Sequence, residues 1–407
     1  MTRIVVVGAG QAGASLAERL RALGHAGDLT LIGAEAHPPY QRPPLSKKYL
    51  LGEMALERLF LRPPAFYAEQ GITLRLGCRV TGIDRAGKAV LLEGGERLDY
   101  DRLALTTGSV PRRLPAAMGG DLPGVFVVRG LSDVDAMAPE FRDGARVLVV
   151  GGGYIGLEAA AVAASKGLHV TLIEAAPRIL GRVASDATAA YFRDLHRAHG
   201  VDLREGVGLV RLLPGADGRV AGAELSDGTT LEVDFAIAGV GIAPDTALAE
   251  AAGLAIDNGI AVDANGRTSD PDIFAAGDCT SFPWQGGRLR LESVPNAIEQ
   301  AEAVAAAMLD PDAPPYVAKP WFWSDQYDVK LQIAGLNTGH DRVVTRKGAR
   351  EGALSVWYFR GERLLAVDAM NDPRAYMTAK RWIEAGLSPA PDEIAEPARD
   401  LKEIAAG

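Results

Sequence analysis

Two glycine-rich segments have a spacing that suits phosphate binding. Residues 8–13 read GAGQAG and residues 151–156 read GGGYIG, and each follows a short apolar run that is rich in valine. In such a segment the first glycine permits a tight turn, the second lets a pyrophosphate approach the backbone, and the third lets the next helix pack closely. The N-terminus of that helix then points free N–H groups at the phosphates. Each segment therefore predicts a dinucleotide-binding βαβ unit.

An acidic residue follows each predicted unit at the place where ribose hydroxyls would bind. The second strand of the later unit, residues 168–173, ends in Glu174, whose carboxylate would bond a ribose and repel a 2′-phosphate. This favours NADH over NADPH, although Arg178 works against the preference. In the earlier unit Ala34 occupies the usual acid position, and Glu35 stands one residue late.

The two units lie about 140 residues apart in one chain. One unit would fit many dehydrogenases, whereas two imply that two dinucleotides are held by one protein. The simplest pair is FAD with NADH, because a nicotinamide delivers hydride and a flavin can accept it and release electrons singly. The chain is therefore predicted to be an oxidoreductase.

The elements that must position these residues follow from the apolar pattern. A helix with Leu16, Leu20 and Leu23 on one face follows the first glycine segment, and short strands and turns come next. The pattern predicts an α/β fold with two Rossmann-like domains and a C-terminal α+β domain. The expected ranges are 1–110 and 243–318 for an FAD-binding domain, 111–242 for an NAD-binding domain and 319–407 for the C-terminal domain.

Composition narrows the class of protein. The 407 residues are 48% hydrophobic and carry a formal net charge of −9, which argues against nonspecific binding to nucleic acid or membranes. No leader or spanning segment is recognisable, so a soluble, cytoplasmic protein is expected. Cys78 and Cys279 form no CxxC pair, and His196 and His199 have no evident third ligand, so no metal site is expected.

A set of motifs over nearly the whole chain resembles the two-dinucleotide flavoproteins, and among them the NADH-dependent ferredoxin reductases of bacterial P450 and oxygenase systems. The motifs are GAGQAG at 8–13, RPPLSK at 42–47, TTG at 106–108, GGGYIGLE at 151–158, GVGIAP at 239–244, FAAGDC at 274–279, ESVPNAIEQA at 292–301 and WFWSDQYD at 321–328. The resemblance implies a glutathione-reductase-type arrangement of the two nucleotide domains.

The resemblance also implies roles for individual residues. Lys47 would lie beside the flavin ring and pair with Glu158, and Asp278 would bond the ribityl hydroxyls. Trp321 and Trp323 would cover the ring edge. Expected FAD contacts are Gly8, Gly10, Ala12, Gly13, Ala34, Glu35, Arg42, Lys47, Val80, Thr107, Gly108, Arg129, Asp278, Val294 and Trp323. Expected NAD contacts are Gly151, Gly153, Tyr154, Ile155, Gly156, Glu158, Glu174 and Gly241. The alternative is that Lys47 is an ordinary loop lysine and Glu158 an acid on a helix surface. Trp321 and Trp323 would then only pack against their neighbours.

The expected electron acceptor is a small [2Fe–2S] ferredoxin or redoxin that serves a cytochrome P450 or an oxygenase. Arg62 matches a family contact position for this partner, and Arg288, Arg290 and Lys330 are further candidates. Glu302 stands where the family has an arginine, so the redoxin is expected to have a different charge pattern. Alternatives are an oxidase, a quinone or rubredoxin reductase, a nitrite-reductase partner, a disulfide reductase, or a flavoprotein that signals or binds partners as apoptosis-inducing-factor relatives do.

Overall fold

A computed structural model describes residues 2–404 and divides the chain into two compact units. Unit 1 comprises the residues up to Arg42 together with Ala55–Val110 and Ile242–Pro320, and unit 2 comprises Pro43–Met54, Pro111–Gly241 and the residues from Trp321 onward. Residues 43–54 belong to unit 2, because the 3₁₀ helix η1 (Pro43–Ser46) packs against α3 (Leu131–Met137) and α4 (Tyr154–Ser165) of that unit. Residues 111–241 and the C-terminal part form one unit by their contacts.

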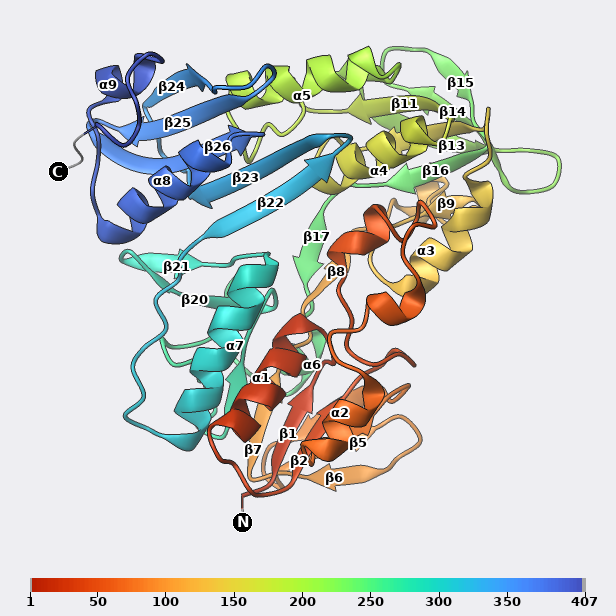
Figure 1. Ribbon diagram of the computed structural model, residues 1–407. Coiled ribbons are helices and arrows are strands. Elements are labelled where there is room, and N and C mark those ends of the chain that lie inside the picture. Colours follow the sequence, from red (N-terminus) through yellow and green to blue (C-terminus); the bar gives the residue numbers. More distant parts are fainter. Residues whose placement is uncertain (1, 405–407) are drawn as a thin grey trace. The chain divides into compact units, whose positions relative to one another are not determined.

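A five-stranded parallel sheet with the strand order β19-β7-β1-β2-β3 forms the centre of unit 1 (Figure 1). Its strands are β1 (Ile4–Val7), β2 (Leu29–Ile32), β3 (Thr73–Arg75), β7 (Arg102–Leu105) and β19 (Ile273–Ala275). The remaining strands are β4 (Val80–Asp84), β5 (Ala89–Leu92) and β6 (Arg97–Asp99) in one small sheet, β18 (Ile260–Ala261), β20 (Thr280–Trp284) and β21 (Gly287–Leu289) in another, and β8 (Ser109–Pro111) paired with β17 (Ile242–Pro244). The helices are α1 (Gln11–Ala22), α2 (Pro64–Glu69), α6 (Ala247–Ala251) and α7 (Val294–Leu309), with a 3₁₀ turn η2 (Leu56–Arg58).

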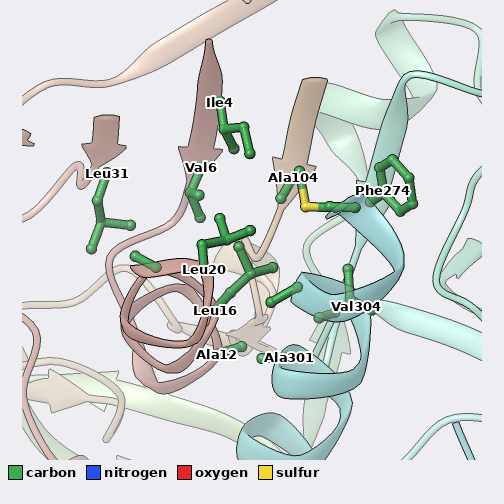
Figure 2. Close-up of a cluster of buried hydrophobic side chains, with 14 of the residues drawn as sticks. Ile4, Val6, Ala12, Leu16, Leu20, Leu31, Ala104, Phe274, Ala301 and Val304 are labelled. Carbon is green, nitrogen blue, oxygen red and sulfur yellow. The ribbon is translucent and has the colours of Figure 1, made fainter. Parts of the chain in front are cut away.

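Helices α1 and α7 pack against each other and against one face of this sheet. Figure 2 shows Leu16 and Leu20 of α1 beside Val304 of α7, with Val6 and Phe274 on the neighbouring strands, and all five side chains are buried. Burial of these apolar groups holds α1 and α7 against the sheet. Leu23 was expected on the same buried face, but α1 ends at Ala22 and Leu23 is 40% exposed.

Unit 2 contains a second five-stranded parallel sheet and a five-stranded antiparallel sheet (Figure 1). The parallel sheet has the order β12-β11-β10-β16-β9, with β9 (Val125–Phe126), β10 (Arg146–Val150), β11 (His169–Glu174), β12 (Asp202–Glu205) and β16 (Phe235–Ala238). The antiparallel sheet has the order β22-β23-β26-β25-β24, with β22 (Trp321–Gln326), β23 (Val329–Gly335), β24 (Arg342–Lys347), β25 (Leu354–Arg360) and β26 (Arg363–Met370). A small sheet contains β13 (Leu209–Pro214), β14 (Val220–Leu225) and β15 (Thr230–Glu232). The helices are α3 (Leu131–Met137), α4 (Tyr154–Ser165), α5 (Asp186–Ala198), α8 (Pro373–Ala385) and α9 (Pro391–Ala395), with the 3₁₀ turns η3 (Ala116–Met118) and η4 (Ala138–Glu140).

The predicted α/β class is confirmed. The central strand of each parallel sheet is largely buried and leads through a glycine segment into a helix, as β1 leads into α1 and β10 leads into α4. The C-terminal part combines the antiparallel sheet with α8, which packs on β23 and β26. Within residues 2–404, no helix combines the length and the apolar character that crossing a bilayer would require.

Candidate functional site

In the glycine segment of unit 1, each of the three positions requires glycine for a different physical reason. Gly8 has a φ of +113°, and a Cβ there would lie 2.2 Å from the carbonyl oxygen of Thr106. A Cβ on Gly13 would lie 1.9 Å from the carbonyl oxygen of Gly8. At Gly10, in contrast, a Cβ would meet no atom within 4 Å. The outer glycines thus allow the turn and the close helix packing, and the middle glycine faces space in which a pyrophosphate can reach the backbone.

The glycine segment of unit 2 repeats this geometry. Gly151 has a φ of +107°, and a Cβ there would lie 2.5 Å from the carbonyl oxygen of Gly239. A Cβ on Gly156 would lie 2.0 Å from the carbonyl oxygen of Gly151, whereas one on Gly153 would meet nothing within 4 Å. Both segments therefore fit a dinucleotide at the N-terminus of a helix.

The acidic residues after the second strands are held in different ways. Glu174 accepts hydrogen bonds from the backbone N–H groups of Gly152 and Ala176, both at 2.8 Å, so its carboxylate is fixed against the glycine segment. Glu35 accepts hydrogen bonds from Arg42 at 2.6 Å and from the hydroxyl of Tyr40 at 2.5 Å. Ala34 precedes it and is exposed. Two carboxylates are thus fixed at the ends of strands where ribose groups can be bound.

Several predicted FAD contacts come together around Asp278 in unit 1. Gly277 has a φ of +85°, and a Cβ there would lie 2.9 Å from the Cβ of Ala12, so the Asp278 loop runs close to the start of α1. Ser109 donates a hydrogen bond to a carboxylate oxygen of Asp278 at 3.1 Å. Thr107 donates to the carbonyl oxygen of Asp245 at 2.6 Å, which holds the TTG loop.

The other predicted FAD contacts are divided between the units. Val294 opens α7 in unit 1, and Val80 opens β4 and packs beside the buried cluster that contains Ile32. Lys47, Arg129 and Trp323 belong to unit 2. Their assignment as flavin contacts stays a prediction.

A buried ion pair in unit 2 joins Lys47 to Glu158. The ammonium nitrogen of Lys47 lies 3.0 Å from Oε1 of Glu158, whose side chain is almost fully buried. Ser324 donates to the same oxygen at 2.7 Å, and Ser46 donates to Oε2 at 2.9 Å. Burial raises the pKa of Glu158, while the charge of Lys47 and the two hydroxyl donors oppose that rise. The carboxylate is thus surrounded by donors that favour its charged form.

Ser46 and Ser324 were not among the predicted site residues, although they stand in the RPPLSK and WFWSDQYD motifs beside residues that were. Asp325 of the second motif lies near the same pair, with a carboxylate oxygen 3.9 Å from the Lys47 nitrogen. Ser46 carried a weak signal, because it directly precedes Lys47 and can therefore donate to a carboxylate that pairs with Lys47, whereas nothing in the sequence beside Ser324 pointed to Glu158.

The remaining predicted NAD contacts lie around the start of α4. The ring of Tyr154 packs against that of Phe322 with centroids 4.9 Å apart, and Ile155 is 45% exposed. Gly241 has a φ of +98° and accepts a hydrogen bond from the N–H of Arg112 at 2.9 Å. Trp321 and Trp323 pack against each other on β22, with centroids 5.6 Å apart.

Three of the four predicted redoxin-docking residues belong to unit 1 and one belongs to unit 2. Arg62 pairs with Glu18 at 3.0 Å, and Arg290 pairs with Glu292. Arg288 donates to the carbonyl oxygen of Val262 at 2.9 Å. Lys330 lies on β23 in unit 2. These positions stay predictions, and the described partners indicate that Arg288 also has a structural role.

The sequence matches the family described as pyridine nucleotide-disulphide oxidoreductase over residues 2–301, and the family described as reductase C-terminal over residues 321–405. The chain belongs to the pyridine nucleotide-disulphide oxidoreductase family. It is 43% identical to putidaredoxin reductase CamA of Pseudomonas putida, over 99% of this chain and 96% of the relative. This confirms the family resemblance drawn from the motifs.

Two solved structures are also similar along nearly their full length. One is a covalent complex of putidaredoxin reductase with putidaredoxin, with a TM-score of 0.95, 42% identity, and coverage of 99% of this chain and 97% of that one. The other is a ferredoxin reductase for the CYP199A2 system from Rhodopseudomonas palustris, with a TM-score of 0.95, 39% identity, and coverage of 99% of each chain.

Proposed function

We propose that the chain is an FAD-dependent NADH:ferredoxin reductase that passes electrons from NADH to a small [2Fe–2S] redoxin. The observation that carries the proposal is the pair of glycine segments with the same geometry, in which Gly10 and Gly153 alone of the motif glycines face open space. Two such segments in one chain suit two dinucleotides. Membership of a pyridine-nucleotide oxidoreductase family supports the same reading.

We assign FAD to the Gly8–Gly13 segment and NADH to the Gly151–Gly156 segment. With the ranges predicted from the sequence, the FAD-binding domain covers residues 1–110 and 243–318, the NAD-binding domain 111–242 and the C-terminal domain 319–407. Bound FAD would accept hydride from a nicotinamide and release electrons singly. The chain supplies the N-termini of α1 and α7 for phosphate and ring charge, and the fixed carboxylate of Asp278 for hydroxyl groups.

The Lys47–Glu158 pair suits the nucleotide chemistry of the proposed reaction. An ammonium group beside a flavin offsets the negative charge that reduction creates, and a fixed carboxylate can orient an amide. Their burial makes both charges effective, because little water screens them. Glu174, held by Gly152 and Ala176, would bond the ribose and disfavour NADPH.

The acceptor follows from the relatives. Putidaredoxin reductase and the reductase of the CYP199A2 system are similar to this chain along its length, so we infer a redoxin partner and a P450 or another oxygenase downstream. Arg62, Arg288, Arg290 and Lys330 remain the candidate docking residues. An oxidase that uses Cys279 as a reactive thiol is disfavoured, because Cys279 is completely buried and burial raises the pKa of its thiol to about 11. We place the reaction in the cytoplasm.

Anaerobic mixing tests the proposal. NADH should bleach the flavin absorption band of the FAD-loaded protein much faster than NADPH does. A [2Fe–2S] redoxin added afterwards should restore the band. Glu174→Ala should reduce the preference for NADH over NADPH. No bleaching by either nucleotide would refute the proposal, and reoxidation by oxygen or quinone but by no redoxin would favour the oxidase or quinone-reductase alternative.

A further inference from the structure

A line of buried polar side chains extends from Glu158 through unit 2. Ser324 donates to Glu158 at 2.7 Å, and Gln326, two residues along β22, donates to the hydroxyl of Ser324 at 3.3 Å. The carbonyl oxygen of the Gln326 side chain lies 2.8 Å from Nε2 of His196 in the last turn of α5. The hydroxyl of Tyr327 lies 3.3 Å from Nδ1 of the same histidine. Ser324, Gln326 and His196 are each completely buried.

The direction of every hydrogen bond in this line follows from the carboxylate. An ionised Glu158 only accepts, so Ser324 must use its single hydrogen for Glu158 and can only accept from Gln326. Gln326 must then present its amide nitrogen to Ser324 and its carbonyl oxygen to His196. The histidine must therefore carry its hydrogen on Nε2, which leaves Nδ1 free to accept from Tyr327. All four bonds thus point toward Glu158, and bonds aligned in this way strengthen one another.

We propose that His196, Gln326 and Ser324 form a positioning relay that orients the carboxylate of Glu158 for its pairing with Lys47. The proposal rests on the function proposed above, because Glu158 is there the acid beside the nicotinamide. The relay gives a role to Ser324 and Gln326 of the WFWSDQYD motif and to the buried histidine of α5. The three residues act through Glu158 and need not contact either nucleotide.

The surroundings of the relay favour a neutral His196. The titratable groups that face it are Tyr327, from the turn after β22, and His199, directly after the end of α5, which stacks on the Tyr327 ring with centroids 3.7 Å apart. Burial lowers the pKa of His196 to about 4, although the bond with Gln326 opposes this. The charged groups that face Glu158 are Lys47 from the η1 segment and, through Lys47, Asp325 from β22. A neutral His196 is the form that the relay requires at neutral pH.

Histidine nitrogen NMR tests the relay directly. In protein labelled with ¹⁵N-histidine, the resonance lost in His196→Asn identifies His196 among the six histidines of the chain. The relay predicts that His196 stays neutral between about pH 5.5 and 8 with its hydrogen on Nε2. A charged His196 at pH 7, or a hydrogen on Nδ1, would overturn the proposal. This result does not depend on whether the protein reduces a redoxin.

A pH profile tests the effect on Glu158. Ser324→Ala removes a donor from the carboxylate, so the acidic limb of flavin reduction by NADH should move upward by about one pH unit. Gln326→Met keeps the Ser324 hydroxyl but removes the amide, and should give a smaller shift in the same direction. The matched control is Thr188→Val, which removes a buried hydroxyl two turns earlier on α5 that bonds Asp368 instead, at 2.7 Å.

The control profile should match that of the wild type. Profiles of Ser324→Ala and Gln326→Met that also match the wild type would overturn the relay, as would an equal shift in Thr188→Val. A wild-type protein whose flavin NADH does not reduce would instead refute the proposed function, and the NMR result would still decide the relay.

Discussion

The ammonium nitrogen of Lys47 and a carboxylate oxygen of Glu158 lie 3.0 Å apart, although the two residues are 111 positions apart in the sequence. Both are largely buried, and two serine hydroxyls complete the shell of the carboxylate. A buried pair of this kind adds little to stability as a whole, but removal of one partner leaves an uncompensated charge.

Lys47→Met should therefore destabilise the protein by about 3–5 kcal/mol, because Glu158 stays buried without its counter-charge. The double variant Lys47→Met/Glu158→Met should recover much of this loss, since it removes both charges. Thermal unfolding of the FAD-loaded proteins measures the difference. A single variant that is as stable as the wild type would show that the pair is not formed.

Gly10 and Gly13 should respond differently to the same substitution. Gly10→Ala places a methyl group in open space, so the protein should fold normally and bind FAD at least about tenfold more weakly. Gly13→Ala places the methyl group 1.9 Å from the Gly8 oxygen, so it should cost several kcal/mol of stability. Unfolding midpoints and FAD content after dialysis separate the two effects. Full FAD affinity in Gly10→Ala would contradict the assignment.

Gly153→Ala and Gly156→Ala form the corresponding pair in unit 2. Gly153→Ala should leave FAD content and the unfolding midpoint unchanged and raise the KM for NADH about tenfold, because only the approach of the second dinucleotide is blocked. Gly156→Ala should lower the unfolding midpoint, since its methyl group would lie 2.0 Å from the Gly151 oxygen. An unchanged KM in Gly153→Ala would place NADH elsewhere.

Asp368 should make stability fall as the pH rises. Burial raises its pKa to about 6, although Tyr358 and Thr188 donate to its Oδ2. Its Oδ1 has no hydrogen-bond partner within residues 2–404. Since the unfolded pKa is about 3.9, the native state binds more protons between these values, and the free energy of unfolding decreases as the pH rises through 6.

Asp368→Asn should remove this dependence. The free energy of unfolding of the variant minus that of the wild type should increase by about 2.4 kcal/mol from pH 4 to pH 8. Denaturant titrations at a series of pH values measure it. A constant difference would show that Asp368 titrates normally.

The two cysteines should differ in reactivity. Cys279 is completely buried and burial raises the pKa of its thiol to about 11, whereas Cys78 is partly exposed. Iodoacetamide at pH 8 should therefore modify Cys78 alone in the native protein, because the thiolate is the reactive form. Mass spectrometry identifies the site, and Cys78→Ser is the control. Modification of Cys279 in the native protein would contradict this prediction and would favour an oxidase that uses Cys279 as a reactive cysteine.

The sequence alone determined the features that a few consecutive residues encode. A valine-rich strand, a glycine turn and a helix start are local, so the segments at Gly8–Gly13 and Gly151–Gly156 could be located with their roles. The second strand of the later unit, predicted at residues 168–173, is found one residue further along, at His169–Glu174. The end of the helix after Gly13 was predicted wrongly, since Leu23 fits the periodicity but lies beyond the last turn.

Only the tertiary structure decided which distant residues meet. Lys47 and Glu158 were paired beforehand through the family resemblance, but nothing in their local sequence predicted Ser324, Gln326 or His196 as neighbours of that pair. These contacts arise because α4, α5 and β22 pack together within unit 2, although they come from separate parts of the chain. The spacing of apolar residues indicates which face of a helix or strand is buried. A hydrogen bond between two elements depends instead on how those elements pack and on their register, which no single segment encodes.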